Sequence, residues 1–160
     1  MSKKTIDLLD KLRRINEEED DEYFDQCVSP PDLALIEKGI PTLEQGIFVP
    51  ASGMIRARFE YAGRWEDAFL DHWLSLKEMA RVPSRKKTMQ RIHQRIEDWE
   101  GAVIGDVKLS ELSLFGFDGT EQTETYLVWS DKKEPSVVYY HDQHENKFPN
   151  LNAYLKYITT

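Results

Sequence analysis

The sequence contains very little cysteine, and its apolar runs are short. Cys27 is the single cysteine among the 160 residues, which excludes an internal disulfide and a zinc site built from several cysteines. We interpret Cys27 as a small, semi-buried residue rather than a nucleophile, because nearby carboxylates disfavour the reactive thiolate. No apolar run approaches the ~20 residues of a membrane-spanning helix, and the first residues contain no hydrophobic signal-peptide region. We therefore expect a cytoplasmic protein without a membrane partner.

Signatures of catalysis and cofactor binding are also missing. The sequence has no glycine-rich phosphate loop, no Gly-x-Ser-x-Gly elbow and no dinucleotide fingerprint. We therefore expect a protein that is not an enzyme and binds no cofactor. One alternative stays open, because His141 and His144 have carboxylates beside them and such groups can ligate a metal. We favour a polar turn and no metal there, since both histidines lie where a predicted strand ends.

Positive charge is in short supply. The chain has 21 Lys and Arg against 29 Asp and Glu, a net charge of −8. Such a field repels nucleic acid and favours basic partners. We therefore expect a protein partner, no nucleic-acid partner, and a monomer or weak dimer. The candidate partner-binding residues are acidic and form a run followed by two turn residues: Glu17, Glu18, Glu19, Asp20, Asp21, Glu22, Asp118 and Asp131.

Apolar periodicity divides the first 101 residues into helices and strands. We predict helices over 5–15, 30–39 and 65–81, and a further helix between Ser84 and Gly101. We predict strands over 47–49 and 55–61, the latter from strict alternation of apolar and charged residues. The acidic run ends the first helix, because carboxylates oppose the dipole at a helix C-terminus. The segment near 17–25 is expected to be solvated and mobile.

The last third of the chain has the pattern of an antiparallel meander closed by a helix. Strands are expected near 112–117, 125–129 and 136–141, with an Asp118-Gly119 hairpin turn between the first two. A helix over 151–158 follows, capped by Asn150. Several carboxylates fall at the predicted turns and are interpreted as turn formers: Asp118, Glu121, Glu124, Asp131 and Glu134. We therefore predict one α+β domain over 1–160, with an antiparallel or mixed sheet, a C-terminal meander and flanking helices.

Two further features carry weaker functional hypotheses. The predicted helix after Ser84 is basic on one face, through Arg85, Lys86, Lys87, Arg91 and Arg95, and we expect it to balance acidic surface or contact a partner. The tryptophans fit core positions, except that Trp65 lies off the stripe of its predicted helix. Trp65, or the pair Tyr139 and Tyr140, could therefore stand at the mouth of a small ligand pocket.

The meander resembles a known family. The residues that carry the resemblance are Leu112-Ser-Leu-Phe-Gly-Phe-Asp-Gly119, the strand ending at Trp129, Glu134-Pro-Ser-Val-Val-Tyr-Tyr-His-Asp142, and Asn150-Leu-Asn-Ala-Tyr-Leu-Lys-Tyr-Ile158. They resemble the SUKH superfamily, which includes yeast cell-wall regulators of the Smi/Knr type and bacterial immunity proteins. The helix from Pro30 to Gly39 looks like the early helix of that family, whereas 47–101 matches it poorly.

The resemblance implies an α+β fold and a non-enzymatic binding role. Its bacterial members typically hold a toxin, often a nuclease, so we expect an immunity protein that neutralises a basic toxin domain. A carboxylate-rich surface suits that role, because a nuclease site attracts phosphate. A regulatory scaffold of the same family, and a metal-dependent enzyme using His141 and His144, are the alternatives.

Overall fold

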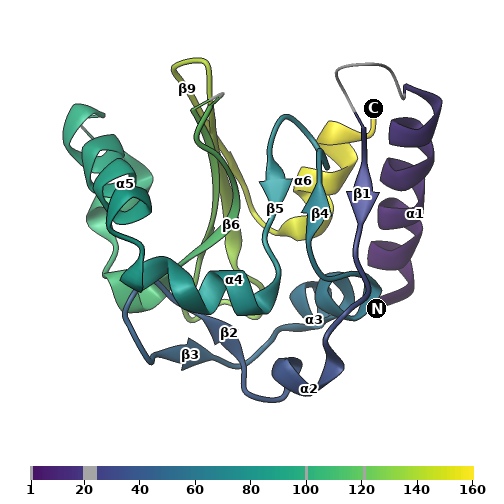
Figure 1. The fold of residues 1–160 in the computed structure, drawn as a ribbon, viewed down its shortest axis with the longest axis horizontal. Coiled ribbons are helices and arrows are strands. Elements are labelled where there is room, and N and C mark those ends of the chain that lie inside the picture. The colour runs from purple at the N-terminus through teal and green to yellow at the C-terminus, as the bar shows by residue number, and fades with distance from the viewer. Residues whose placement is uncertain (1, 20–24, 100, 121) are drawn as a thin grey trace.

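The chain forms one α+β domain. The computed structural model describes residues 2–19, 25–99, 101–120 and 122–160 (Figure 1). Its α-helices are α1 (Ser2–Glu18), α2 (Leu33–Ile36), α3 (Gly53–Tyr61), α4 (Leu76–Arg81), α5 (Lys86–Asp98) and α6 (Leu151–Ile158). Its strands are β1 (Cys27–Val28), β2 (Ile40–Pro41), β3 (Phe48–Val49), β4 (Trp65–Glu66), β5 (His72–Trp73), β6 (Leu112–Asp118), β7 (Thr123–Val128), β8 (Ser136–His141) and β9 (His144–Phe148). Three short 3₁₀ turns cover Val82–Ser84, Val103–Asp106 and Leu109–Glu111. None of the described helices has the length and apolar character to span a bilayer.

The central element is a seven-stranded antiparallel sheet in the order β1-β4-β5-β6-β7-β8-β9. The predicted meander supplies its second half, and β9 extends it by a strand that the sequence did not predict. β2 and β3 pair separately as a small ribbon below it. A bulge between Leu114 and Gly116 shifts the register of β6 against β7, and the extra residue, Phe115, packs against Trp73. The predicted fold class, an α+β domain with an antiparallel meander and flanking helices, is confirmed.

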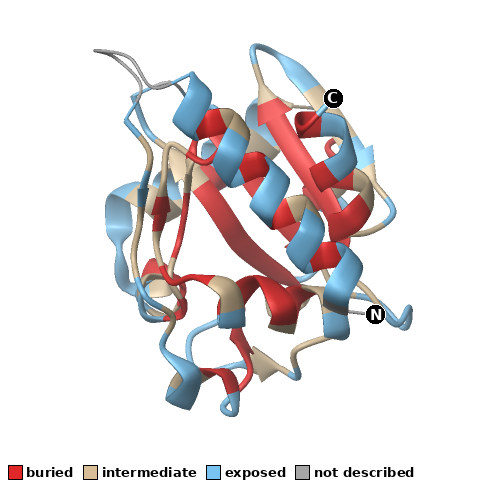
Figure 2. Cartoon of the chain, turned by 90° about the vertical axis from the view of Figure 1, so that its right-hand side faces the viewer, coloured by how far each residue is buried: buried red, intermediate tan, exposed pale blue. Residues whose placement is uncertain are grey.

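Helices cover both faces of the sheet. α1, α3 and α6 contact one another on one face, whereas α4 and α5 lie on the other (Figure 1). Thr5 and Asn152 join α1 to α6 through a buried 2.7 Å hydrogen bond. Leu9 and Leu12 of α1 are fully buried, and Figure 2 shows the outer helices turning exposed residues to solvent and buried ones to the sheet.

The strand predicted over 55–61 is wrong, because these residues form helix α3. The alternation of apolar and charged residues suggested a strand, but Arg58 is completely buried rather than solvent-facing. Ile55, Arg58, Phe59 and Ala62 are all buried. Their spacing is that of one helix face, i, i+3, i+4 and i+7. A charged residue on the buried side therefore concealed a helical period.

The helix predicted over 65–81 is also wrong for its first half. β4, a turn and β5 occupy residues 65–73, and only α4 is helical. Ser75 begins α4 with a capping box, in which its hydroxyl accepts from the Glu78 amide and the Glu78 carboxylate accepts from the Ser75 amide. The signature Ser-x-x-Glu stands in the sequence and marks this start. The apolar spacing across Trp65 and Trp73 arises instead from two facing strands.

Other predicted boundaries also shift. Residues 30–39 contain one short helix, α2, because the preceding segment runs beside β4: the Ser29 amide donates to the Arg64 carbonyl at 2.9 Å and the Gly63 amide to the Ser29 carbonyl at 3.0 Å. Ser84 does not cap α5, since its hydroxyl donates to the Arg81 carbonyl. Cys27 is exposed rather than semi-buried, because the β1 edge strand carries it.

The hairpin turns differ from the expected chemistry. Positive φ values occur at Asp142 and Gln143 in the β8–β9 turn, and at Gln122 before β7. Asp118 instead accepts a hydrogen bond from the Thr120 amide, so the predicted Asp118-Gly119 turn is held by a side chain rather than by a left-handed backbone. The helix cap at Asn150 is confirmed, because its side chain accepts from the Ala153 amide at 2.9 Å.

Candidate functional site

A cleft opens between the sheet and the helices α4 and α5. We call it the sheet cleft, and its volume is about 420 Å³. That volume falls within the range of ligand-binding clefts. The polar and aromatic residues that line it include Arg64, His72, Glu78, Arg85, Phe117 and Asp118. Strands β4, β5 and β6 supply one side, α4 and the start of α5 the other.

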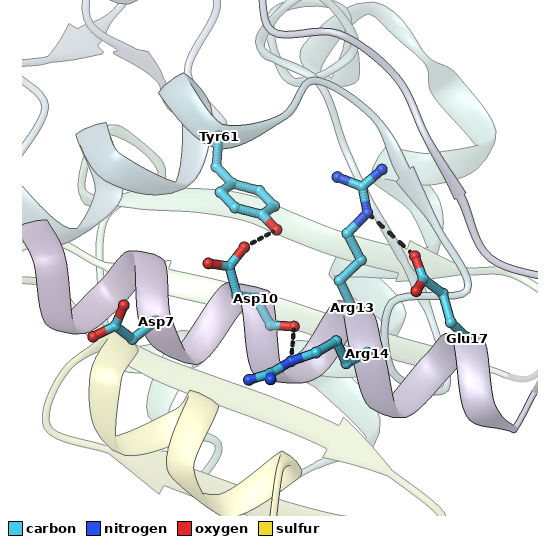
Figure 3. A pocket seen from close by; sticks show the side chains of 6 residues that line it. All are labelled: Asp7, Asp10, Arg13, Arg14, Glu17 and Tyr61. Atoms are coloured by element: carbon cyan, nitrogen blue, oxygen red, sulfur yellow. Dashed lines mark hydrogen bonds and ion pairs between the residues drawn. The ribbon is translucent and has the colours of Figure 1, made fainter.

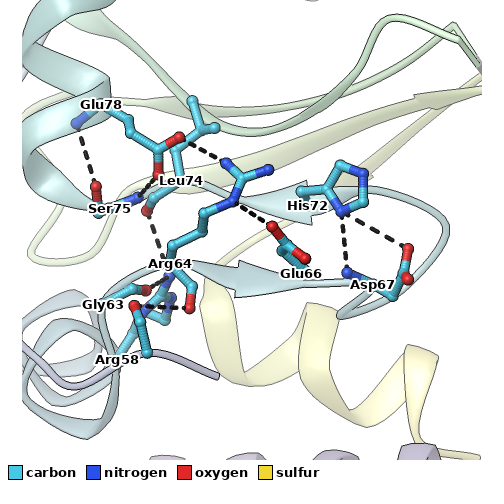
Figure 4. A network of polar contacts seen from close by, with 10 residues as sticks. Arg58, Gly63, Arg64, Glu66, Asp67, His72, Leu74, Ser75 and Glu78 are labelled. Atoms are coloured by element: carbon cyan, nitrogen blue, oxygen red, sulfur yellow. Dashed lines mark hydrogen bonds and ion pairs between the residues drawn. The ribbon is translucent and has the colours of Figure 1, made fainter. Parts of the chain in front are cut away.

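Arg64 joins the floor of the sheet cleft to its helical wall. Its Nε lies 3.2 Å from Glu66 Oε1, and its Nη1 lies 2.6 Å from Glu78 Oε2 (Figure 4). Glu78 also closes the capping box at Ser75, so a single carboxylate serves both the helix start and the ion pair. Two carboxylates hold the Arg64 guanidinium, which fixes its position and leaves this group of three side chains with one excess negative charge.

His72 lies between two carboxylates at one end of the sheet cleft. The Asp67 amide donates to His72 Nδ1 at 3.0 Å, and His72 Nε2 lies 3.6 Å from Asp118 Oδ2. Because Nδ1 accepts a hydrogen bond, the neutral ring carries its proton on Nε2, facing Asp118. The turn that supplies the donor is unusual, since Asp67 and Leu70 both have positive φ. The backbone thus orients the imidazole.

A buried guanidinium supports the loop that begins β4. Arg58 donates to the carbonyls of Ala62 at 2.6 Å and Gly63 at 2.8 Å, and its guanidinium lies over the ring of Phe59. Burial lowers the pKa of Arg58 to about 9, so it still carries its charge at neutral pH. Its charge is compensated by carbonyl dipoles and aromatic faces rather than by a carboxylate contact.

The basic face predicted for α5 is partly turned inward. Arg95 and Arg91 point at Glu124 of β7, whose side chain is fully buried. Glu124 was interpreted as a turn former, and that is wrong, because it lies inside β7 opposite Tyr140. The ion pair fixes α5 over the sheet. Lys87 is one of the basic side chains of α5 that remain exposed.

A second buried carboxyl lies on the opposite face of the sheet. Asp71 is completely buried, and its Oδ2 accepts a hydrogen bond from Thr125 at 2.7 Å. Burial raises the pKa of Asp71 to about 7. Among the described residues, its Oδ1 has no hydrogen-bond partner, and neither do the buried hydroxyls of Tyr139 and Tyr154. Asp71 was not among the candidates predicted from the sequence. A helix was predicted over 65–81, in which an acidic residue is ordinarily exposed, whereas Asp71 lies in the turn between β4 and β5.

A groove of about 430 Å³ runs along the exposed side of α1 (Figure 3). Tyr61 of α3 donates from its hydroxyl to Asp10 Oδ1 at 2.6 Å. Arg13 Nε lies 3.6 Å from Glu17 Oε1 at the far end of the groove. We call it the α1 groove; it is lined by the carboxylates of Asp7, Asp10 and Glu17 together with Arg13, Arg14 and Tyr61.

The structure brings carboxylates of three elements to one end of the molecule. Asn16 donates to the Ala68 carbonyl at 2.9 Å, and Thr123 to the Leu70 carbonyl at 3.1 Å. These bonds tie the last turn of α1, the β4–β5 turn and the start of β7 together. We call this the acidic end, and its described carboxylates are Glu17, Glu18, Glu19, Asp67 and Asp118.

The predicted partner-binding residues do not form one surface. Glu17, Glu18 and Glu19 are exposed at the acidic end, where Asp118 also lies. Asp131 is exposed at the opposite end, because the β6–β7 and β7–β8 turns lie at opposite ends of an antiparallel meander. Three further candidates, Asp20, Asp21 and Glu22, lie outside the described residues, as does most of the segment predicted to be mobile.

The residues predicted as ligand or metal sites are packed or paired within the fold. Trp65 is fully buried and its Nε1 donates to Gln26, while Tyr139 is 3% exposed, so neither stands at a pocket mouth. His141 and His144 pair across the β8–β9 turn, and the His141 ring stacks on Tyr139. Among the described residues, no group of three or more His, Cys, Asp or Glu could hold a metal ion.

Comparisons with known proteins return no relative. No protein-family model, no curated protein and no solved structure matches the chain. The geometry of the sites therefore carries the functional argument.

Proposed function

We propose that this protein is a non-enzymatic binding protein of the immunity type, which binds and neutralises a basic toxin domain through the acidic end. The proposal keeps the resemblance of the meander to the SUKH superfamily as its premise. The observation that carries it is that residues 17–19, Asp67 and Asp118 lie at one end of the molecule. Hydrogen bonds from the side chains of neighbouring residues to backbone carbonyls of the β4–β5 turn hold them there. Glu17, Glu18 and Glu19 are exposed there and Asp67 and Asp118 are partly exposed, so a basic partner would meet carboxylates from three elements.

The charge of the whole chain supports the same proposal. A net charge of −8 attracts a basic partner over distance, and complementary charge accelerates association. Arg13 neutralises part of the acidic end through its pair with Glu17, but such an exposed pair contributes little to stability. Glu18 and Glu19 have no ion pair within the residues that the structure describes, which leaves them available to a partner's Lys or Arg.

The site chemistry favours binding over catalysis. Both ring nitrogens of His72 face groups of the protein, Nδ1 the Asp67 amide of the β4–β5 turn and Nε2 the Asp118 carboxylate at the end of β6. The Arg64 guanidinium is held by Glu66 and Glu78. These residues therefore shape the rim and floor of the cleft beside the acidic end.

The test is co-expression with the polypeptide encoded beside this chain's own gene. We expect the two to co-purify and the chain to restore growth of cells that the polypeptide poisons. Glu18→Lys/Glu19→Lys should slow association at least tenfold and weaken its dependence on salt. The matched control, Glu44→Lys/Asp131→Lys, reverses two exposed charges at the opposite end and should leave the rate within twofold.

Two results contradict the proposal. Co-purification without restored growth would point to a regulatory scaffold instead of an immunity protein. Equal slowing by both double variants would show that net charge, rather than the acidic end, governs association.

A further inference from the structure

A small apolar pocket lies at the end of the molecule opposite the acidic end. It opens between α2, the β2–β3 ribbon and α4, and its volume is about 180 Å³. Leu35, Phe48, Leu76 and Ala80 supply most of its apolar lining. Small-molecule sites usually begin near 300 Å³, so this pocket suits a single apolar side chain of a larger partner.

The pocket owes its shape to a glycine. Gly39 has a φ of +105°, and a Cβ there would lie 2.7 Å from the Val49 carbonyl oxygen. Only glycine therefore lets the chain turn from α2 into β2 so closely against β3. That turn brings Phe48 into the lining, opposite Leu76 of α4. The pocket is thus built by a glycine turn and a capped helix.

Three basic side chains surround this apolar lining. Lys38, Lys77 and Arg81 are exposed, and no carboxylate belongs to the lining. Within the described residues none of the three has an ion pair. Lys38 Nζ lies 4.9 Å from the centre of the Phe48 ring, which keeps one ammonium at the pocket edge. We call the whole feature the basic pocket.

We propose that the basic pocket binds an acidic peptide segment of a partner protein, with one apolar side chain in the pocket and flanking carboxylates on Lys38, Lys77 and Arg81. Charge complementarity selects this occupant, because the local charge is positive in a chain whose net charge is −8. The lining offers one aromatic face, which suits a side-chain anchor better than the base stacking that nucleic acids need.

The surface beside the pocket can accommodate a peptide longer than one residue. A second groove of about 310 Å³ shares Lys38, Gly39 and Phe48 with the basic pocket. Arg56 lines this groove and forms an ion pair with Glu37. An extended peptide anchored in the pocket could therefore continue past Phe48. This surface is separate from the acidic end, so the inference does not depend on the proposed function.

The probe is the peptide acetyl-Asp-Glu-Phe-Asp-Glu-amide, titrated into the ¹⁵N-labelled full-length chain at low salt. We expect amide shifts confined to the surroundings of Leu35, Phe48 and Ala80, and an affinity that falls as salt rises. Lys77→Glu/Arg81→Glu should weaken binding at least tenfold. The matched control, Lys11→Glu/Lys147→Glu, makes the same charge change at exposed positions of α1 and β9 and should alter affinity less than twofold.

Peptide controls separate the anchor from the charge. Replacing phenylalanine by serine in the peptide should weaken binding at least fivefold, and a peptide with lysine in place of the acids should not bind. Shifts outside the pocket, or no shift at millimolar peptide, would overturn the proposal. So would tighter binding of a ten-nucleotide oligothymidylate, or self-association that Lys77→Glu/Arg81→Glu abolishes, because the occupant would then be nucleic acid or a second copy.

Discussion

Arg95 of α5 donates two hydrogen bonds of 2.8 Å to the carboxylate of Glu124 of β7, and the Glu124 side chain is completely buried. Arg95 also donates to the Gln122 carbonyl at 3.0 Å, and its guanidinium lies over the Tyr140 ring. The Glu124 carboxylate raises the pKa of Arg95. One side chain therefore holds α5 against the sheet.

Removing Arg95 should destabilise the fold strongly. Arg95→Met leaves the buried Glu124 carboxylate with two more distant partners among the described residues, Arg91 at 3.6 Å and the Tyr126 hydroxyl at 3.5 Å. We expect a loss of about 3–5 kcal/mol in the free energy of unfolding, measured by urea denaturation. Adding Glu124→Gln to Arg95→Met should recover part of the loss, because the uncompensated carboxylate charge at position 124 is then gone.

A control on the same helix separates this effect from the loss of a basic residue. Lys87→Met replaces an exposed side chain of α5 and should change stability little. If Lys87→Met and Arg95→Met were equally stable, the buried ion pair would not be what anchors α5.

Stability should fall as pH rises from about 4 to 8, through Asp71. Burial raises the pKa of this carboxyl from its ordinary 3.8 to about 7, with further contributions from Asp118 and Glu124. The folded state therefore keeps a proton that the unfolded state releases, so stability is fully present below pH 4 and is lost as pH passes 7. The change amounts to roughly 4 kcal/mol as an upper figure.

Asp71→Asn isolates that contribution, because asparagine imitates the protonated carboxyl. It can still accept the Thr125 hydrogen bond and cannot ionise. We expect Asp71→Asn to be more stable than the wild type at pH 8 and close to it at pH 4, in thermal unfolding at both values. A constant difference across this range would mean that the pKa of Asp71 is not raised in the folded state.

His72 should populate a single neutral tautomer. The Asp67 amide donates to Nδ1, so the proton belongs on Nε2, facing Asp118. Long-range ¹H–¹⁵N correlation spectra above neutral pH should show a bare Nδ1 and a protonated Nε2 for His72. His93, which is exposed on α5, serves as the reference for an unconstrained ring. A protonated Nδ1 on His72 would contradict the orientation of the β4–β5 turn.

Local signals in the sequence were enough for the meander and its closing helix. Alternating apolar residues and turn residues at short intervals predicted β6, β7 and β8, and Asn150 predicted the cap of α6. The same local reasoning failed at Arg58, because a charge buried under carbonyls and aromatic rings looks like a solvent-facing residue. It failed again at 65–73, where apolar residues on two short strands have the spacing of a helix. The Ser-x-x-Glu capping signature at Ser75 indicates the true start of α4.

The candidate sites needed more than local signals. The acidic run was visible in the sequence, but its association with Asp118 and its separation from Asp131 follow from strand order. The pairing of Arg95 with Glu124 joins residues 29 positions apart. The basic pocket likewise combines α2, the β2–β3 ribbon and α4. Contacts between residues so far apart along the chain produce no periodic pattern in the sequence.

The sequence by itself determined the α+β class, the antiparallel meander, the acidic net charge and the scarcity of cysteine, because each follows from composition or from contacts between near neighbours along the chain. Only the tertiary structure decided which charges are buried and which carboxylates share a surface. Burial and proximity depend on how strands order in the sheet and how helices pack on it, and those arrangements are set by long-range contacts among residues such as Arg58, Asp71 and Glu124.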